Sequence, residues 1–375
     1  MWGIFLGKPL RSHVGVFFDY MESESTNFRN LADFNAGREN AINNSRGSIR
    51  NIGFRIREEW DFLPQWTLAA GLGYEHSQYS IDQVNFGFTT GTVSSQASAN
   101  RSFHNVAPDV SLTYHPTENA RYWGRVSSGY GTPSLGNLTT SPTGLPGANN
   151  ALDDERNINI ELGSHVQLNQ QLTFSLVGFW TFFKDELISQ SVLGGTGNFT
   201  ANADSSEYRG LEVGVEWIPI DGLTFSGAYT LVDAKFINFT DTIQVNGVGT
   251  NVNQDGSTVP AVEPNVLNLR TAYDHSSGLG GWVEVSWLDD YFVNNANTLK
   301  AQSATVVNIN AHYHKDVKWG WVRFIKTFVQ VDNLFDQTYM GSGAIVSDST
   351  ADANKQAFLL APPLSVFGGI TIGLF

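Results

Sequence analysis

The chain has 375 residues, a formal net charge of −14 and no cysteine. The lack of cysteine excludes a disulfide framework, a zinc–thiolate cluster and a thiol nucleophile, and the negative charge argues against a nucleic-acid partner. Charged residues make up 15% and aromatic residues 13% of the chain, whereas about 25% charged residues is usual for a soluble domain. Mean hydropathy is nevertheless −0.18, and no stretch approaches the ~20 consecutive apolar residues of a membrane helix. A transmembrane β-barrel reconciles these values, because only every second residue of its strands must face lipid.

Apolar and polar residues alternate along many short segments of the chain. In the segment 306–313, for example, Val307 and Ile309 fall on one side and Asn308 and Asn310 on the other. Side chains in a strand alternate between faces with period two, so such segments predict strands with one apolar surface. In chain order the clearest segments are 13–24, 52–62, 66–74, 110–114, 122–128, 158–163, 172–182, 211–217, 225–231, 267–273, 282–288, 306–313, 329–331 and 370–374.

The connections between these segments alternate in length. Some connections are very short turns, such as those at 64–65 and 221–222. These alternate with long polar loops, which are expected at 75–102, 131–154, 190–206, 236–261 and 340–362. Outer-membrane barrels have short periplasmic turns and long external loops. The sequence therefore predicts an all-β, transmembrane, antiparallel up-and-down β-barrel that is incomplete, with about fourteen strands and no plug domain. The alternative is a large soluble β-protein whose aromatic residues form its core.

The charged residues within the predicted strands follow the same pattern. They sit at the parity opposite to the apolar residues of their own strand: Arg55, Arg57, Glu59, Glu161, Glu212, Glu216 and Glu284. An Arg or Lys on the lipid face costs about 2–4 kcal/mol at the membrane midplane. We therefore expect the interior of the barrel to be wet or filled by another polar body.

Several segments resemble the TonB-dependent outer-membrane receptors of the siderophore-receptor type. The stretch from Val329 to Tyr339 resembles their "NNLFDxxY" segment, and Ala361-Pro362-Pro363 with the terminal Phe375 resembles their last strand. The stretch from Glu155 to Gly163 is similar to the family's E-x-x-x-N-x-E-x-G pattern, and Tyr208 to Val213 to its "RGxE" strand start. Two further segments also fit, Tyr130–Ser134 and Tyr291–Thr298.

This resemblance implies a receptor in the outer membrane of a Gram-negative bacterium, in contact with its lipid and lipopolysaccharide. Such a receptor takes up an iron–siderophore complex when a TonB-type energy-transducing protein acts on a plug within the barrel. The family's barrels have 22 strands and a plugged lumen, whereas this chain matches only the C-terminal part. We therefore expect residues 1–375 to be the C-terminal portion of the barrel, from a truncated or split sequence.

Ligand contacts are expected from the long loops, where binding residues concentrate. The candidate loop aromatics are Tyr79, Phe86, Phe88, Phe199, Phe239 and Tyr291. Aromatic rings can pack on a siderophore and a tyrosine can donate a hydrogen bond, but the same residues can also close the barrel mouth by packing on one another. The family-motif residues Asn333, Leu334, Phe335, Asp336 and Tyr339, together with Phe375, are expected to have a structural role.

No pattern in the sequence predicts catalysis or an intrinsic cofactor. His312 and His314 are spaced for a metal on one strand, and Asp153-Asp154-Glu155 could hold a divalent cation; solvated histidines and a solvated loop are the favoured readings. We expect an energised transporter of a ferric siderophore, and a passive porin-like channel is the alternative. Whether the siderophore is a catecholate, a hydroxamate or mixed stays open, as do cobalamin, nickel, copper and heme as cargo.

Overall fold

The structure is a computed structural model that describes residues 2–30, 38–87, 90–141, 146–191, 198–245, 248–343 and 358–374. Fifteen strands form one antiparallel sheet in which every strand pairs with its neighbours along the chain. These strands are β1 (Trp2–Phe5), β2 (Lys8–Asn30), β3 (Arg38–Leu63), β4 (Trp66–Phe86), β5 (Val93–Thr117), β6 (Ala120–Gly131), β7 (Glu155–Gln167), β8 (Leu172–Ser191), β9 (Asn198–Ile220), β10 (Leu223–Asn238), β13 (Asn265–Asp274), β14 (Leu279–Leu288), β17 (Ala304–Trp319), β18 (Val322–Asp332) and β21 (Ser365–Leu374). The prediction of an antiparallel up-and-down sheet of about fourteen strands is confirmed.

The remaining elements lie in the long connections. They are the 3-10 helix η1 (Gly136–Thr139) and three hairpins, formed by β11 (Thr240–Val245) with β12 (Val248–Asn253), β15 (Tyr291–Phe292) with β16 (Lys300–Ala301), and β19 (Met340–Gly343) with β20 (Phe358–Leu360). Across the described ranges, no helix has the length and apolarity needed to span a membrane.

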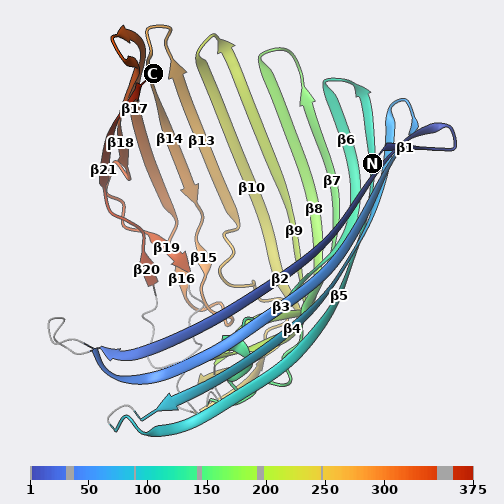
Figure 1. Cartoon of the computed structure of the whole chain (residues 1–375), viewed down its shortest axis with the longest axis vertical. Helices are drawn as coiled ribbons and strands as arrows, with labels where there is room; N and C mark the ends of the chain where they lie inside the picture. The colour runs from blue at the N-terminus through green and yellow to red at the C-terminus, as the bar shows by residue number, and fades with distance from the viewer. Residues whose placement is uncertain are drawn as a thin grey trace.

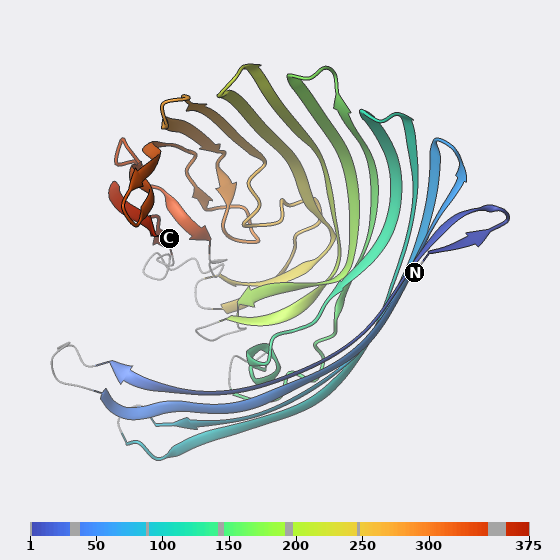
Figure 2. The ribbon, with the colours of Figure 1, turned by 45° about the horizontal axis from the view of Figure 1, so that its top comes forward.

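The sheet is strongly curved, so that it has a concave face and a convex face (Figures 1 and 2). All short turns lie at one end, which we call the short-turn end, and all long connections lie at the other, the long-loop end (Figure 1). The helix η1 lies inside the curve of the sheet (Figure 2). Within the described residues, the two outermost strands each have one neighbour: β1 pairs with β2 and β21 pairs with β18.

Four of the predicted loops are wrong in part. Residues 190–206 were expected to form a loop, but β8 continues to Ser191 and β9 begins at Asn198, where the two strands pair. The expected loop 340–362 contains the hairpin of β19 and β20. Residues 75–102 were expected to form a loop, but β4 continues to Phe86 and β5 begins at Val93, and the two strands stay paired as far as Phe86 and Val93. Residues 236–261 were also expected to be a loop, but they contain the hairpin of β11 and β12. Beyond the apolar band both faces of a strand can be polar, so the alternation that identifies a strand disappears there.

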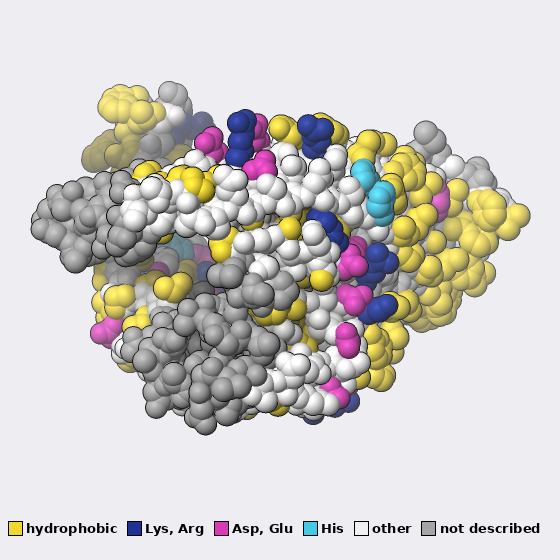
Figure 3. All heavy atoms as spheres, turned by 90° about the horizontal axis from the view of Figure 1, so that it is seen from below, with side chains coloured by type: hydrophobic (Ala, Val, Ile, Leu, Met, Phe, Trp, Pro, Cys, Tyr) yellow, Lys and Arg dark blue, Asp and Glu magenta, His cyan; other side chains and the backbone are white. Residues whose placement is uncertain are grey.

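The apolar residues of the alternating segments lie on the convex face. Val16 is 74%, Leu162 69% and Ile370 74% exposed. A large patch of such exposed apolar side chains is unusual on a protein surface that faces water. Viewed from the long-loop end, hydrophobic side chains gather along one outer flank, bordered by acidic, basic and histidine side chains (Figure 3). The small buried clusters lie instead at the long-loop end, around η1 and the hairpins.

Candidate functional site

The polar half of each strand faces the concave side of the sheet. On β7 the charged and amide residues Asn157, Asn159 and Glu161 lie on this side, while Ile158 and Ile160 lie on the exposed convex side. This division follows from the alternation of the strand. The expectation that the strand charges lie opposite to the apolar residues agrees with this arrangement.

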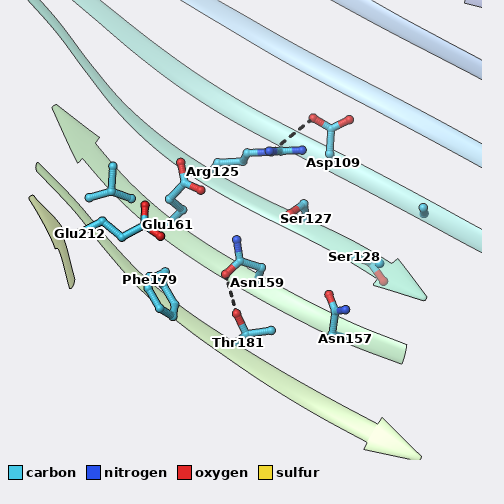
Figure 4. Close-up of a pocket in the computed structure, with 13 residues that line it drawn as sticks. Asp109, Arg125, Ser127, Ser128, Asn157, Asn159, Glu161, Phe179, Thr181 and Glu212 are labelled. Carbon is cyan, nitrogen blue, oxygen red and sulfur yellow. Dashed lines mark hydrogen bonds and ion pairs between the residues drawn. The ribbon is translucent and has the colours of Figure 1, made fainter. Parts of the chain in front are cut away.

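A hollow of about 640 Å³ lies on the concave face across β5 to β9 (Figure 4). Its lining is a mixture of charged, amide, hydroxyl and aromatic groups, with side chains from neighbouring strands pointing to a common space (Figure 4). The lining residues are Ala107, Asp109, Arg125, Ser127, Ser128, Gly129, Asn157, Asn159, Glu161, Val177, Phe179, Thr181 and Glu212. The volume lies within the range of ~300–1,000 Å³ that is usual for ligand pockets.

A chain of ion pairs leads into this hollow from β2 and β3. Arg11 Nε lies 3.1 Å from Glu59 Oε2, and Arg57 Nε lies 3.3 Å from Glu59 Oε1. Arg57 Nη1 then donates to Asp109 Oδ2 at 2.5 Å, and Arg125 Nε lies 3.9 Å from the same oxygen. Opposite charges thus alternate across the wall, so that these cations and Asp109 largely neutralise one another.

Two carboxylates of the hollow have no such cationic partner. Glu161 accepts a hydrogen bond from Trp123 Nε1, and Glu212 lies on the adjacent part of the wall (Figure 4). Among the described residues, no Lys, Arg or His nitrogen lies within 4.0 Å of either carboxylate. Arg125 is the cross-strand partner of Glu161, but within the part of the chain that the structure describes neither Glu161 nor Glu212 is engaged in an ion pair, so both carboxylates can accept a cationic group that enters the hollow.

Aromatic side chains on the concave face lie flat against glycines of the neighbouring strand. A Cβ atom at Gly210 would collide with the ring of Phe179, and one at Gly163 would collide with the ring of Trp123. The same relationship holds for Phe17 over Gly53, Phe328 over Gly369 and Phe324 over Gly373. Because glycine has no side chain, these rings cover the strand and leave the space in front of it open.

The aromatic Tyr79 lies on β4 and is buried. Its hydroxyl shares a 2.7 Å hydrogen bond with Thr132 Oγ1, and its ring meets Phe103 edge to face at 5.4 Å. Both rings belong to a cluster with Leu138 of η1 and with Leu152. Tyr79 therefore holds the connection 132–154 against the concave face.

Two further candidates are buried in separate clusters. Phe239 packs on Phe236, with ring centroids 4.5 Å apart, in a cluster at the long-loop ends of β8 to β10. Tyr291 packs with Val293, and its hydroxyl donates to Met340 Sδ at 2.9 Å. Burial raises the pKa of Tyr291, so its hydroxyl keeps its proton at neutral pH. The structure does not bring Tyr79, Phe239 and Tyr291 together.

The other candidates lie at strand ends or outside the described residues. Phe86 is the last residue of β4, Phe199 lies at the start of β9, and both are half-buried. Phe88 and the terminal Phe375 lie outside the described residues.

The family-motif residues build the turn that follows β18. Asn333 adopts a positive φ of 51°, and its side chain accepts from Gln337 N at 2.8 Å and donates to Gln337 O at 2.9 Å. Asp336, also at φ 51°, accepts from Leu364 N at 2.9 Å through Oδ1. These bonds join both ends of the long connection between β18 and β21. Asn tolerates the left-handed region better than most residues, which explains its place here.

The rest of the motif supports the same turn through its backbone. Leu334 N donates to Val307 O at 2.8 Å, and Tyr339 O accepts from Ala361 N at 2.9 Å. Phe335 is 72% exposed.

The histidine and acidic candidates are engaged by neighbouring side chains. His312 Nε2 lies 2.8 Å from Asp274 Oδ1, and His314 Nε2 lies 3.6 Å from Asp316 Oδ1. Of the acidic group at 153–155, Asp153 and Asp154 each pair with an arginine at 3.5 Å, and Glu155 Oε2 accepts from the backbone of Leu187. Within the described part of the chain, no group of three or more His, Cys, Asp or Glu residues is arranged to hold a metal ion.

Several residues of the hollow were not singled out from the sequence. The alternation of the strands predicts which of their residues face the interior. It does not predict which of these residues meet, because that depends on which strands are neighbours; examples are Asp109, Arg125, Asn159 and Phe179. An available signal is the pairing of concave glycines with concave aromatics on the next strand, as for Phe179 and Gly210.

Comparisons with known proteins agree with this architecture. Residues 2–334 match the family model described as "TonB dependent receptor-like, beta-barrel". Among solved structures, the siderophore receptor PiuA from Acinetobacter baumannii matches with a TM-score of 0.73 and 16% identity, over 99% of this chain and 54% of PiuA.

Two other solved structures match to a similar degree. The ferric citrate transporter FecA matches with a TM-score of 0.71 and 16% identity, over 99% of this chain and 53% of FecA. The ferric yersiniabactin uptake receptor FyuA from Yersinia pestis matches with a TM-score of 0.67 and 16% identity, over 98% of this chain and 51% of FyuA. The chain therefore spans about half the length of these receptors, and at this identity the likeness concerns the fold. Because the family model covers most of its length, the chain belongs to the TonB-dependent receptor family, in its β-barrel region.

Proposed function

We propose that this chain is part of an outer-membrane receptor that takes up a ferric siderophore by an energised mechanism. The family is one of Gram-negative outer-membrane transport receptors rather than of enzymes, and the solved relatives include receptors for iron complexes. The observation that carries the proposal is the charged concave hollow with its two unpaired carboxylates, Glu161 and Glu212. A wall of this kind suits a solvated or protein-filled interior and is unsuited to a dry core.

The two carboxylates support the presence of a polar body inside the barrel. A carboxylate in a confined space is favoured when a cation lies close to it. Among the described residues neither Glu161 nor Glu212 forms an ion pair within 4.0 Å, although Arg125 is the cross-strand partner of Glu161. We infer that a plug carrying Arg or Lys meets this part of the wall, and that a TonB-type protein acts on the plug from the periplasm.

Residues 1–375 contribute, in this proposal, the C-terminal portion of the barrel, and the plug is not among them. The outer sides of β1 and β21 support the first point, because lipid does not tolerate open backbone edges and, within the described residues, each of these strands has one neighbour. The coverage of about half of each solved relative supports it as well.

The ligand is expected to enter from the long-loop end. There the half-buried Phe86 and Phe199 offer aromatic surface to a siderophore, while Tyr79, Phe239 and Tyr291 hold the connections around the entrance. Phe88, which follows β4 in the sequence and lies outside the described residues, remains a candidate.

Lipid and lipopolysaccharide are the proposed partners of the convex face. Its apolar band is bordered at the long-loop end by exposed polar pairs such as Arg46 with Glu22, at 2.6 Å. Basic groups just outside an apolar band suit phosphorylated lipid headgroups.

Uptake of radioactive iron tests the proposal directly. Cells carrying the intact gene, its deletion, or the Glu161→Gln/Glu212→Gln variant are supplied with iron bound to a catecholate, a hydroxamate or a mixed siderophore. We expect uptake of at least one complex that is lost on deletion, on removal of TonB and on addition of a protonophore. Glu207→Gln, at a half-buried position on the convex face, serves as the matched control. Uptake that continues without TonB indicates the passive channel instead, and no gene-dependent uptake of any complex contradicts the assignment to iron.

A further inference from the structure

The convex face carries a second hollow, close to the short-turn end. It has a volume of about 710 Å³ and lies over β13, β14, β17 and β18. Its lining is largely apolar: Thr271, Tyr273, His275, Leu279, Gly280, Gly281, Trp282, Val283, Ile309, Asn310, Ala311, Val329 and Val331.

The strand register explains why the surface is hollow here. Gly281 pairs with Ala311, so two adjacent strands present almost no side chain at the same height. Tyr273 borders this position on β13, and Val329 borders it on β18.

The rows above and below the hollow carry larger side chains. Val283 and Ile309 pair on the side toward the middle of the sheet, and Leu279 and Tyr313 pair on the side toward the turn. The result is a depression that is closed on four sides and open toward the apolar exterior.

The charges at the turn below the hollow are divided between the two faces. The nearby acids are engaged on the concave side, because Asp274 lies 2.8 Å from His312 and Asp316 lies 3.6 Å from His314. On the convex side, His275 lines the hollow, and Lys315 is exposed two residues beyond Tyr313 on the same face. His275 also contacts Ser277 Oγ, at 2.8 Å.

We propose that this hollow binds one acyl chain of a glycerophospholipid from the periplasmic leaflet, with the lipid phosphate held at His275 and Lys315. An apolar groove with a basic group at its mouth matches a lipid with its anionic headgroup at the interface. The inference rests on the proposed position of the convex face in the membrane and is independent of the cargo.

The test uses the full natural polypeptide, purified in mild detergent and titrated with phosphatidylglycerol while bound lipid is counted by native mass spectrometry. In Ala311→Phe an aromatic ring fills the hollow, and we expect the most tightly retained lipid to be lost. Ala70→Phe is the matched control, because Ala70 is an exposed alanine on the convex face of β4, away from the hollow. Heat-modifiable migration on a gel verifies that each barrel is folded.

The headgroup contact is tested separately. A basic residue near the membrane surface contributes about 1 kcal/mol to the attraction of an anionic lipid, so Lys315→Ala should weaken phosphatidylglycerol binding about fivefold and leave diacylglycerol binding unchanged. Equal lipid retention by Ala311→Phe, Ala70→Phe and the natural protein would overturn the proposal. So would a change of oligomeric state in Ala311→Phe without loss of lipid, since the occupant would then be a second copy. None of these outcomes depends on iron uptake.

Discussion

Arg57 and Asp109 meet across an intervening strand. Arg57 on β3 and Asp109 on β5 both pair with Gly71 of β4, and their side chains join above it at 2.5 Å. A Cβ atom at Gly71 would collide with Asp109 Oδ1. Because Gly71 has no side chain, Arg57 on β3 can reach Asp109 on β5 across β4.

Gly71→Val is expected to break this ion pair and to lower the free energy of unfolding by about 1–3 kcal/mol, as overpacking usually does. Guanidinium unfolding followed by tryptophan fluorescence measures the effect. Gly73→Ala is the control, because a Cβ there meets Ala107 at an ordinary 3.7 Å. Equal stability of Gly71→Val and the natural protein would show that the wall adapts without cost.

The ring of Trp123 should respond to a change at Gly163. Gly163→Val places a side chain where the indole lies, so the ring must move away from the wall and lose its hydrogen bond to Glu161. We expect a loss of about 1–3 kcal/mol in stability and a shift of tryptophan emission. Gly178→Ala is the control, because a Cβ there has open space around it; unchanged emission in Gly163→Val argues against the close contact.

The turn after β18 depends on the side chain of Asn333. Asn333→Gly keeps the backbone at positive φ accessible but removes the bonds to Gln337 and Pro362. Since an unmade bond to a buried group costs about 1–3 kcal/mol, we expect faster proteolysis between β18 and β21. Exposed Phe335→Ala should leave the rate unchanged, and an unchanged rate in Asn333→Gly would remove the role given to the side chain.

Glu186 is expected to make the stability of the protein depend on pH. Glu186 lies near the long-loop end of β8, which begins at Leu172. It is therefore farther from the short turn than the ~9–11 residues with which a strand crosses the membrane. Burial raises the pKa of Glu186 above its ordinary value of 4.5, although Ser206 and Tyr208 donate hydrogen bonds to its carboxylate. The unfolded chain therefore loses this proton at lower pH than the folded one, and stability should fall as pH rises from 4.5 through the raised pKa.

Glu186→Gln should abolish this part of the pH dependence. The difference in stability between the variant and the natural protein should therefore shift in favour of the variant from pH 4 to pH 7. Unfolding midpoints measured between pH 4 and pH 8 test the prediction, with the half-buried Glu207→Gln as control. A midpoint that rises with pH by the same amount in all three proteins is incompatible with a buried acid at this position.

The sequence was sufficient for the fold because membrane strands repeat a simple pattern. Ile158 and Ile160 against Asn159 and Glu161 define both a strand and its two faces, and each short turn places the next strand beside it. The strand ends beyond the apolar band, such as β4 around Tyr79, were missed because polar residues occur on both of their faces and the alternation disappears.

The candidate site was harder to predict because it depends on contacts across strands. Whether Arg57 reaches Asp109 is decided by the register of three strands and by the glycine between them. The sequence identified the loop aromatics as residues of the long-loop end, but it did not predict how deeply each one is buried. Tyr79 is buried beside η1, whereas Phe86 is half-buried at a strand end.

The central claim is that the convex face lies in hydrocarbon and the concave face in a polar interior. These 375 residues contain no cysteine. A single cysteine is introduced at each position from Asn157 to Gly163 in turn and carries a nitroxide spin label, in the full polypeptide in lipid bilayers, with any cysteine elsewhere in that polypeptide replaced. Accessibility to oxygen, which concentrates in lipid, and to a water-soluble nickel complex is then measured at every position. We predict that oxygen accessibility peaks at positions 158, 160 and 162 and falls at 157, 159, 161 and 163. High nickel accessibility at positions 158, 160 and 162, or the absence of a two-residue period, would contradict the claim.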